Sequence, residues 1–300
     1  MRLKDLGEFN FIDRVSKGVK LSDRVVKGIG DDAAVLKYTK DKFLLLTCDM
    51  LIEGRHFYRD IAPELIGRKA LSCSISDIAA MGGVPKCCVI SVALPSSLDV
   101  RYVDGLYRGI KSSARKFNID LVGGDTVSSE KIIIDVALLG EVEKENLALR
   151  SGAEKKDAIF VTGSIGGSKR GKHLRFIPRL KEARFLVENF KVNSMIDISD
   201  GLIADLGHIL KESRFGAVIY EKDIPLSKDA GSFDSAIRDG EDFELVFTVP
   251  LNQASSLIKL WPFKTRLSRI GEICDRKKGF CLVRRNNRVE QIEPKGFTHF

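Results

Sequence analysis

Residues 43–49 read Phe-Leu-Leu-Leu-Thr-Cys-Asp, a short apolar run that ends in a carboxylate. A run of this length is typical of a buried strand, which we expect to end at Asp49. Residues 63–80 then show helical spacing, with Pro63 suited to the first turn and Gly82-Gly83 marking the stop. A buried strand followed by a long helix predicts a domain that mixes α and β structure.

The same alternation extends along the rest of the chain. In the first half we expect strands at 87–94 and 131–142 and a helix at 100–117. In the second half the pattern predicts helices at 181–189 and 202–213 and strands at 158–162, 195–198, 217–220, 244–249 and 279–283. The charged stretch Glu143–Glu145 lies between the halves, so we expect two domains, 1–145 and 146–300.

The composition of the 300 residues excludes several classes of protein. Hydrophobic residues make up 44% and charged residues 30%, which is enough apolar material for a core and argues against disorder. No apolar run approaches the roughly 18 residues of a membrane span, and residues 1–11 lack the apolar segment of a signal peptide. The six cysteines form no CxxC pair, which favours reduced thiols in a cytoplasmic protein. The net charge of +8 is scattered, so we expect a solvated surface and no nucleic-acid partner.

Carboxylates occur where an apolar core is expected. Asp77 is the only charge on the helical stripe formed by positions 66, 70, 73, 77 and 80. Other acidic residues border glycine turns, strand ends or a helix start: Asp31-Asp32, Asp49, Asp125, Asp197, Asp200 and Glu241-Asp242.

Each of these carboxylates except Asp77 also has an ordinary structural explanation when taken singly. Asp32 and Asp125 fit turn positions, Asp31 is interpreted as a turn residue, and Asp200 or Ser199 fits a helix N-cap. Together, however, half-buried carboxylates repel one another and cost several kcal/mol unless they are paired or bind a cation. Mg²⁺ prefers oxygen ligands and accompanies nucleotide phosphates, so the set predicts a magnesium site beside a nucleotide.

Residues 166–173 read Gly-Gly-Ser-Lys-Arg-Gly-Lys-His and nearly match the phosphate-loop pattern G-x-x-x-x-G-K-[ST]. The last position is His173, which has no hydroxyl, and the loop begins several residues after the strand that ends at Thr162. We therefore interpret it as a flexible glycine loop with basic residues. The lone His56 is more often structural, and His173, His208 and His299 show no metal-ligand spacing; no nucleophile motif such as GxSxG is present.

These motifs resemble the thiamine-monophosphate kinase family over nearly the whole chain and in the family's order. The matching stretches are Gly-Ile-Gly-Asp-Asp-Ala-Ala (28–34), Thr-Cys-Asp (47–49), Gly-Arg-His-Phe (54–57), Ser-Asp-Ile-Ala-Ala-Met-Gly-Gly (76–83), Gly-Gly-Asp-Thr (123–126), Asp-Ile-Ser-Asp-Gly (197–201), Gly-Glu-Asp-Phe-Glu-Leu (240–245) and Pro-Lys-Gly-Phe-Thr-His-Phe (294–300). The aspartate motifs are shared with a wider superfamily that includes aminoimidazole ribonucleotide synthetase. Residues 54–57 and the C-terminal stretch 294–300 narrow the resemblance from the superfamily to the thiamine enzyme. Cys48, Asp239 and Phe297 depart from the family pattern.

The resemblance implies an α+β, two-domain aminoimidazole ribonucleotide synthetase-like fold, with an N-terminal mixed sheet and helices that form a homodimer and a C-terminal α/β domain. It implies ATP-dependent phosphorylation of thiamine monophosphate to thiamine diphosphate with several Mg²⁺ ions. The metal ligands it implies are Asp32, Thr47, Asp49, Asp77, Asp125, Asp197 and Asp200. The residues it implies for ATP are Tyr107, Gly124, Asp125, Arg150 and Ser199, and those for the thiamine substrate are His56, Glu241 and Phe297.

The acceptor in this interpretation is a phosphate monoester, which is mostly dianionic at neutral pH and needs no general base. We therefore expect direct in-line transfer with no covalent nucleophile. Two alternatives stay open from the sequence. One is another ATP-dependent synthetase of the same superfamily, and the other is a dimer that binds metal and nucleotide without catalysis.

Overall fold

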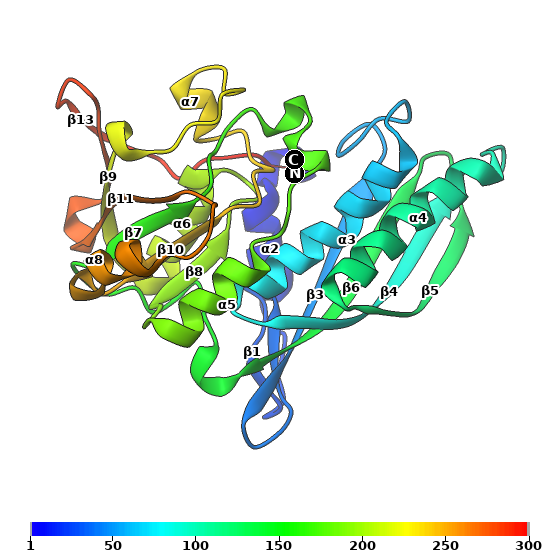
Figure 1. Cartoon of the computed structure of the whole chain (residues 1–300), viewed down its shortest axis with the longest axis horizontal. Coiled ribbons are helices and arrows are strands. Elements are labelled where there is room, and N and C mark those ends of the chain that lie inside the picture. Colours follow the sequence, from blue (N-terminus) through cyan, green and yellow to red (C-terminus); the bar gives the residue numbers. More distant parts are fainter. Residues whose placement is uncertain (1, 299–300) are drawn as a thin grey trace.

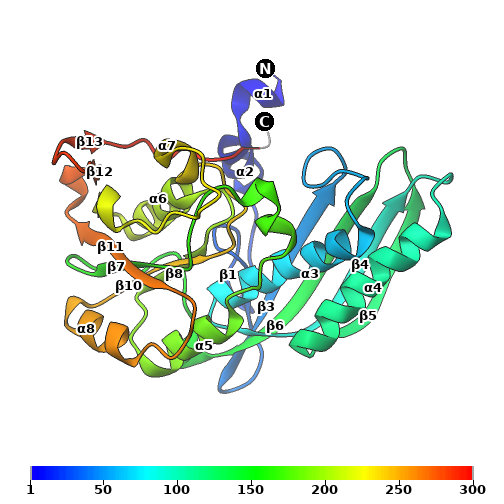
Figure 2. The same cartoon turned by 45° about the horizontal axis from the view of Figure 1, so that its top comes forward.

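Two β-sheets with packed helices make up the computed structural model of the protein (Figures 1 and 2), which describes residues 2–298. The first sheet has the strand order β1-β2-β3-β6-β4-β5. Its strands are β1 (Val25–Lys27), β2 (Ala34–Lys37), β3 (Lys42–Ile52), β4 (Val84–Leu94), β5 (Asp120–Ser128) and β6 (Ile133–Glu143). All neighbours are antiparallel except the parallel pair β4–β5, so the sheet is mixed.

Helices α3 (Pro63–Ala80) and α4 (Val100–Phe117) cover one face of this sheet (Figure 1). The two helices pack closely because glycines lie at their contact: a Cβ on Gly67 would lie 2.0 Å from the Leu106 carbonyl oxygen, and one on Gly109 would lie 2.0 Å from that of Glu64. Within the described chain no helix covers the other face, and apolar side chains there are exposed, among them Leu46, Met50 and Val89.

The second sheet has the strand order β13-β12-β9-β11-β7-β10-β8. Its strands are β7 (Ala158–Thr162), β8 (Ser194–Asp197), β9 (Gly216–Tyr220), β10 (Leu245–Val249), β11 (Leu267–Cys274), β12 (Phe280–Val283) and β13 (Val289–Gln291). Helix α6 (Leu202–Ser213) packs on one face, and α5 (Leu180–Asn189) and α8 (Leu251–Leu260) pack on the other. Both faces are therefore covered, which explains why every residue of β7 and β10 is buried.

Helix α3 lies between the two sheets and contacts α5 and β8 as well as its own sheet (Figure 1). Most of its side chains are therefore buried, including polar ones such as Lys69, Ser74 and Ser76. This position brings the polar residues of the first domain against the strand ends of the second.

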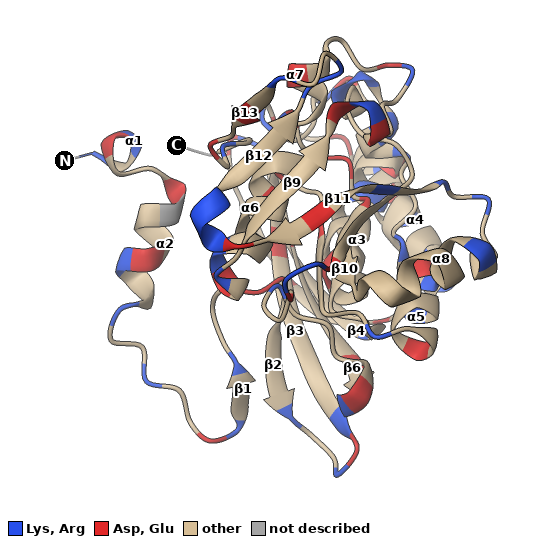
Figure 3. Cartoon of the chain, turned by 90° about the vertical axis from the view of Figure 1, so that its left-hand side faces the viewer, with Lys and Arg blue, Asp and Glu red and all other residues tan. Residues whose placement is uncertain are grey.

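The N-terminal helices α1 (Leu3–Leu6) and α2 (Glu8–Ser16) form an arm joined to β1 by an extended segment (Figure 3). Glu8 at the start of α2 lines the same cavity as Phe297 from the C-terminal segment. The short helix α7 (Phe233–Ala236) lies in the loop between β9 and β10. Lys and Arg residues are spread over both domains in Figure 3, and no helix among residues 2–298 is long and apolar enough to cross a membrane.

The structure confirms the α+β, two-domain class, and helices 63–80, 100–117 and 202–213 have the expected bounds. One expectation at the site was wrong, and one structural alternative that the sequence left open does not apply. Strand β3 continues to Ile52 through pairing with β6, so Asp49 lies inside the strand and does not end it. Asp125 lies within β5 and is not a turn residue, because residues 123–128 pair with β4. Helix α8 and strand β11 were not predicted; Gly271, where a bulge interrupts β11, obscures the alternation of that strand.

Candidate functional site

Three aspartates from distant parts of the sequence meet at the contact between the domains. Asp32 precedes β2, Asp77 lies near the end of α3, and Asp197 ends β8. One carboxylate oxygen from each lies within 4.8 Å of the others. All three are among the residues for which the sequence predicted a metal site, and their convergence depends on the central position of α3.

Hydroxyl groups orient these carboxylates and their neighbour Asp49. Thr47 on β3 donates to Asp77 at 2.5 Å, and Ser76 on α3 donates across the domain contact to Asp197 at 2.5 Å. Ser74 donates to Asp49 at 2.7 Å. The helix and the strand therefore present their polar groups to one another in an otherwise apolar layer.

The electrostatic state of the cluster favours a bound cation. Burial raises the pKa of Asp77 well above its ordinary value, and repulsion from Asp49 and Asp197 raises it further. Burial and repulsion from Asp32 raise the pKa of Asp197 in the same way, and burial raises that of Asp49 to about 6. The Asp32 Oδ2 atom is buried and has no hydrogen-bond partner among the described residues. Oxygen ligands, mutual repulsion and an unpartnered carboxylate oxygen fit a divalent cation such as Mg²⁺.

Arg150 connects the cluster to a cavity of about 420 Å³. Its guanidinium donates to Asp32 at 2.6 Å, and its backbone N–H donates to Asp31 at 3.0 Å. Asp31, Arg150, Ser199 and Asp200 line this cavity. The Asp31 side chain is fully buried, and burial together with the charge of Asp32 raises its pKa to about 6. Asp31 is thus part of the site and not merely a turn residue.

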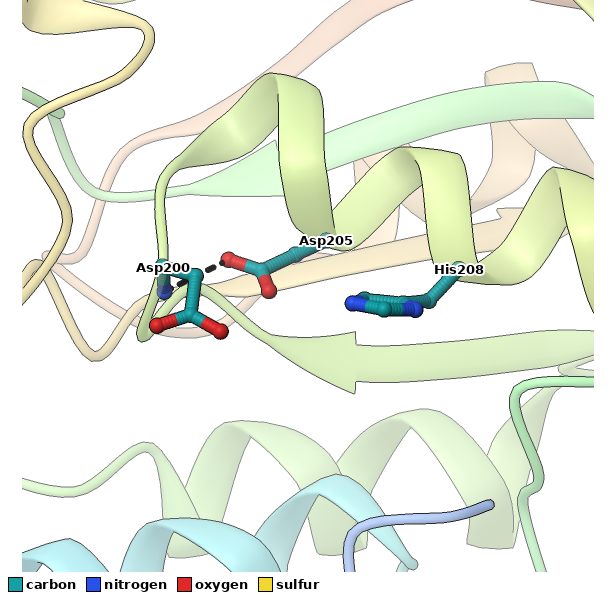
Figure 4. A group of neighbouring side chains, drawn as sticks. All are labelled: Asp200, Asp205 and His208. Atoms are coloured by element: carbon teal, nitrogen blue, oxygen red, sulfur yellow. Dashed lines mark hydrogen bonds between the residues drawn. The ribbon is translucent and has the colours of Figure 1, made fainter. Parts of the chain in front are cut away.

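Asp200, just before α6, and Asp205 and His208 on its first turns form a second group (Figure 4). The Asp205 carboxylate accepts a hydrogen bond from the Asp200 backbone N–H at 3.1 Å, which fixes the loop that carries Asp197 and Ser199. Burial raises the pKa of Asp200 to about 6 and lowers that of His208 to about 4, so His208 is neutral at physiological pH. Neither Asp200 nor Ser199 caps α6, the structural alternative that the sequence left open, because Gly201 lies at the N-cap and α6 has no side-chain cap.

Two further cavities continue from the first. One of about 220 Å³ is lined by Glu8, Asp49, Ser199 and Asp200, and also by His56, Glu241 and Phe297. The other, of about 490 Å³, shares His56 and Glu241 with it and extends toward residues 169–174. The three cavities therefore form a row, with Ser199 and Asp200 at one junction and His56 and Glu241 at the other.

The glycine loop 163–173 holds a carboxylate of the protein itself. Buried Asp242 accepts hydrogen bonds from the Gly166 N–H at 3.0 Å and from Ser168 Oγ, and it lies 3.3 Å from Lys172 Nζ. Gly166 has a φ of +87°, and a Cβ there would lie 2.4 Å from that of Ala236. The loop's anion position is occupied by Asp242, which agrees with the sequence argument against a phosphate loop.

Three of the expected nucleotide residues lie elsewhere within the chain. Asp125 is exposed on the edge strand β5. It pairs with Ser91 on β4, Ser91 pairs with Asp135 on β6, and Asp135 pairs with Met50 on β3. Side chains in register share a face, so Asp125 projects from the open face, three strand spacings or roughly 14 Å from β3. Gly124 lies beside it on β5, and half-buried Tyr107 packs in α4. A single chain does not bring these three to the carboxylate cluster.

Both domains of the chain match family models of known proteins. Residues 30–142 match the AIR synthase related protein, N-terminal domain, and residues 134–284 match the corresponding C-terminal domain. The chain is 35% identical to the thiamine-monophosphate kinase of Aquifex aeolicus (strain VF5) over all of both chains. It is 32% identical to that of Bacillus subtilis (strain 168), over 98% of this chain and 100% of the relative. The chain belongs to the thiamine-monophosphate kinase family.

A solved structure of this family, AaThiL complexed with AMPPCP and TMP, matches with a TM-score of 0.87 and 35% identity. The match covers 100% of this chain and 99% of that one. The agreement extends over both domains, so the family's two-domain architecture applies to the full chain.

Sequence reasoning missed several residues at this family member's site. Lys69, His173, Asp205 and His208 all contact residues of the predicted set, although the two histidines show no ligand spacing in sequence. The sequence did contain a sign that Asp205 belongs to a site, because it is the only acidic residue in the apolar stretch Leu202–Leu210. Asp77 is likewise the only charge on the apolar stripe of helix 63–80. Lys69 gave a similar sign, because it is a charged residue on the buried helix α3. His299, one of the histidines considered, and Phe300, which ends the last matching stretch, lie outside the described residues.

Proposed function

We propose that the protein transfers the γ-phosphoryl group of ATP to thiamine monophosphate, giving thiamine diphosphate and ADP. The row of three cavities with the carboxylate cluster beside it carries this proposal. It allows a nucleotide at the Arg150 end, an acceptor base at the His56–Glu241 end, and transfer between them. The ATP analogue and TMP in the related AaThiL complex support the same two substrates.

The metal ligands in this proposal are Asp32, Thr47, Asp49, Asp77, Asp197 and Asp200, which line or adjoin the middle of the row. Several Mg²⁺ ions held there would screen the repulsion between two polyanions and stabilise charge on the transferring group. Ser74 and Ser76 hold Asp49 and Asp197 in place by hydrogen bonds. Arg150 supplies a positive charge at the nucleotide end.

Proton transfer needs no dedicated residue in this mechanism. The acceptor phosphate is mostly dianionic at neutral pH, and a dianion attacks without a general base. Neutral His208 lies on the far side of Asp205 and is not required as a base. We infer direct in-line transfer, with the protein supplying position and electrostatics and forming no covalent intermediate.

We also infer that the active form is a homodimer whose open N-terminal sheet faces meet. Exposed Leu46, Met50 and Val89 would be buried in such an interface. Gly124 and Asp125 lie on the edge strand β5 of the same sheet, and Tyr107 lies on α4, which contacts β5; all three are away from the cluster of their own chain. A second copy gives these residues a role, because they would complete a nucleotide and metal site formed by both protomers.

A coupled assay of ADP release tests the function directly. We expect Mg²⁺-dependent ADP release with thiamine monophosphate, matched one to one by thiamine diphosphate, and no label on the protein from γ-³²P-ATP alone. Release of ADP only with formylglycinamidine ribonucleotide would instead show a synthetase of the wider superfamily. Nucleotide binding without turnover on either acceptor would show a binding protein.

A further inference from the structure

Lys69 on α3 is a buried cation whose ammonium group is fully partnered. Its side chain is 0% exposed, and its Nζ lies 2.9 Å from the His56 carbonyl oxygen, 2.8 Å from His173 Nδ1 and 2.7 Å from Glu241 Oε1. A lysine has three N–H donors, and these three contacts use all of them when His173 Nδ1 accepts. A buried charge of this kind is stable only when paired, so Lys69 constrains the groups around it.

His173 approaches the other oxygen of the same carboxylate. Its Nδ1 lies 3.0 Å from Glu241 Oε2 and 2.8 Å from Lys69 Nζ. One Nδ1 atom either accepts from Lys69 or donates to Glu241, and in both cases it lies between the ammonium and the carboxylate. Although burial favours the neutral acid, the His173 hydrogen bond and the charge of Lys69 hold the pKa of Glu241 at about 2.

The backbone also fixes the direction of Glu241. Its φ is +58° and that of Phe243 is +50°, a left-handed conformation that residues with a Cβ rarely adopt. Such strain persists only where the surroundings hold it, and it is concentrated at functional sites. The N–H of Glu241 donates to the Ser199 carbonyl oxygen at 2.7 Å, which ties this strained turn to the loop between the first two cavities.

The glycine loop delivers His173 to this position. Asp242 binds the Gly166 end of the loop and Lys172, which immediately precedes His173. The loop also places Lys169 with its Nζ 4.5 Å from the centre of the Phe297 ring, while Arg55 lies 4.9 Å from that ring. Residues 169–174 thereby form one wall of the 490 Å³ cavity into which Glu241 projects.

We propose that Lys69 and His173 are positioning residues that orient the Glu241 carboxylate so that it selects an acceptor whose base presents N–H donors. A carboxylate has about four lone-pair positions; Lys69 donates to one on Oε1, and His173 Nδ1 lies 3.0 Å from Oε2. The remaining positions face the cavity and can accept the N–H groups of an exocyclic amino group such as that of an aminopyrimidine. This inference rests on the proposed function, since thiamine monophosphate carries such a base.

The test compares thiamine monophosphate with its oxy analogue, in which a carbonyl replaces the amino group and turns a donor into an acceptor. Calorimetric Kd values in the presence of Mg²⁺ and AMPPCP, and steady-state kcat and KM, are measured for the wild-type protein and for Lys69→Met and His173→Gln. Lys111→Met, an exposed position on α4, is the matched control.

We expect the wild-type protein to favour the amino compound and each site variant to lower that preference about 10- to 100-fold, the loss of one charged hydrogen bond. The change should lie in the acceptor Kd and KM, while kcat at saturation and the KM for ATP stay within about twofold. Unfolding curves check that the variants fold. If Lys69→Met does not fold, His173→Gln provides the test on its own.

Two results distinguish a wrong positioning role from a wrong proposed function. If the wild-type protein turns over thiamine monophosphate but the variants keep its full preference, the positioning role is wrong and the function stands. If the wild-type protein binds and discriminates the two compounds without turnover, the proposed function is wrong, and the loss of preference in the variants still supports the positioning role. Equal wild-type affinity for both compounds overturns the inference.

Discussion

Replacing Asp77 by asparagine should make the metal-free protein more stable and the enzyme nearly inactive. Asp77 is buried among carboxylates, and asparagine keeps its shape while removing its charge. Asparagine can still accept from Thr47, so the fold has no reason to change. The two effects have opposite signs because the same repulsion that destabilises the empty site creates the attraction for a cation.

The magnitudes follow from the geometry. Two unit charges 4.8 Å apart, the spacing within which the three carboxylate oxygens lie, repel by about 3 kcal/mol at an effective dielectric constant of about 20. Partial protonation of the empty cluster reduces this, so we expect a gain of about 1–3 kcal/mol. At about 2 °C per kcal/mol for a large domain, the Tm should rise by about 2–6 °C. Losing one electrostatic stabiliser should lower kcat about 10²- to 10³-fold.

The assays are thermal unfolding with and without Mg²⁺ and steady-state ADP release. Wild-type protein should gain Tm on addition of Mg²⁺, and Asp77→Asn should gain much less. Asp104→Asn, the same change at an exposed position on α4, is the control and should match the wild-type protein in all three measurements. A variant that is less stable without metal, or that keeps near-normal activity, would refute the reasoning.

Three further predictions address other parts of the molecule. Burial raises the pKa values of Asp49 and Asp200 from 3.8 to about 6, so the folded state binds their protons more tightly than the unfolded state does. The Tm of the metal-free protein should therefore fall as the pH rises from about 4.5 to about 7. Mg²⁺ should restore the Tm at about pH 7, and differential scanning calorimetry measures both effects. Asp242→Ala leaves the Gly166 N–H and Lys172 without their acceptor and should lower the urea-unfolding free energy by about 3 kcal/mol; an unchanged midpoint would contradict the role of Asp242 as the anchor of the glycine loop. Val89→Asp on the open sheet face should give a monomer by light scattering and lose activity, whereas Ile258→Asp on exposed α8 should leave the dimer intact; a dimeric, active Val89→Asp would argue against pairing through this face.

Much of the fold was predictable because its strands and helices have strong local patterns. Pro63 and Gly82-Gly83 gave helix 63–80 its bounds, and uniformly apolar runs marked the buried strands of the second sheet. Local pattern failed where pairing decided the outcome: β3 extends past Asp49, and β5 includes Gly124 and Asp125, because neighbouring strands supply the hydrogen bonds. Propensity alone disfavours glycine in a strand, and tertiary pairing overrides it.

Some residues of the candidate site could be predicted from the sequence, and others could not. Asp77 could be recognised from sequence because a lone charge on an apolar helical face has no local explanation. Lys69 and His173 are 104 residues apart, and nothing near either one indicates that their nitrogens lie 2.8 Å apart.

The sequence by itself determined which residues need an explanation: carboxylates placed among apolar residues are costly unless they are paired or bind a cation, and that holds whatever the fold. Only the tertiary structure decided which of them meet. Helix α3 passes between the two sheets and joins Asp77 to Asp32 and Asp197, while Asp125 projects from the opposite face of the sheet. The reason is physical, because burial and charge are properties of each residue, whereas distance across a domain contact depends on how whole elements pack.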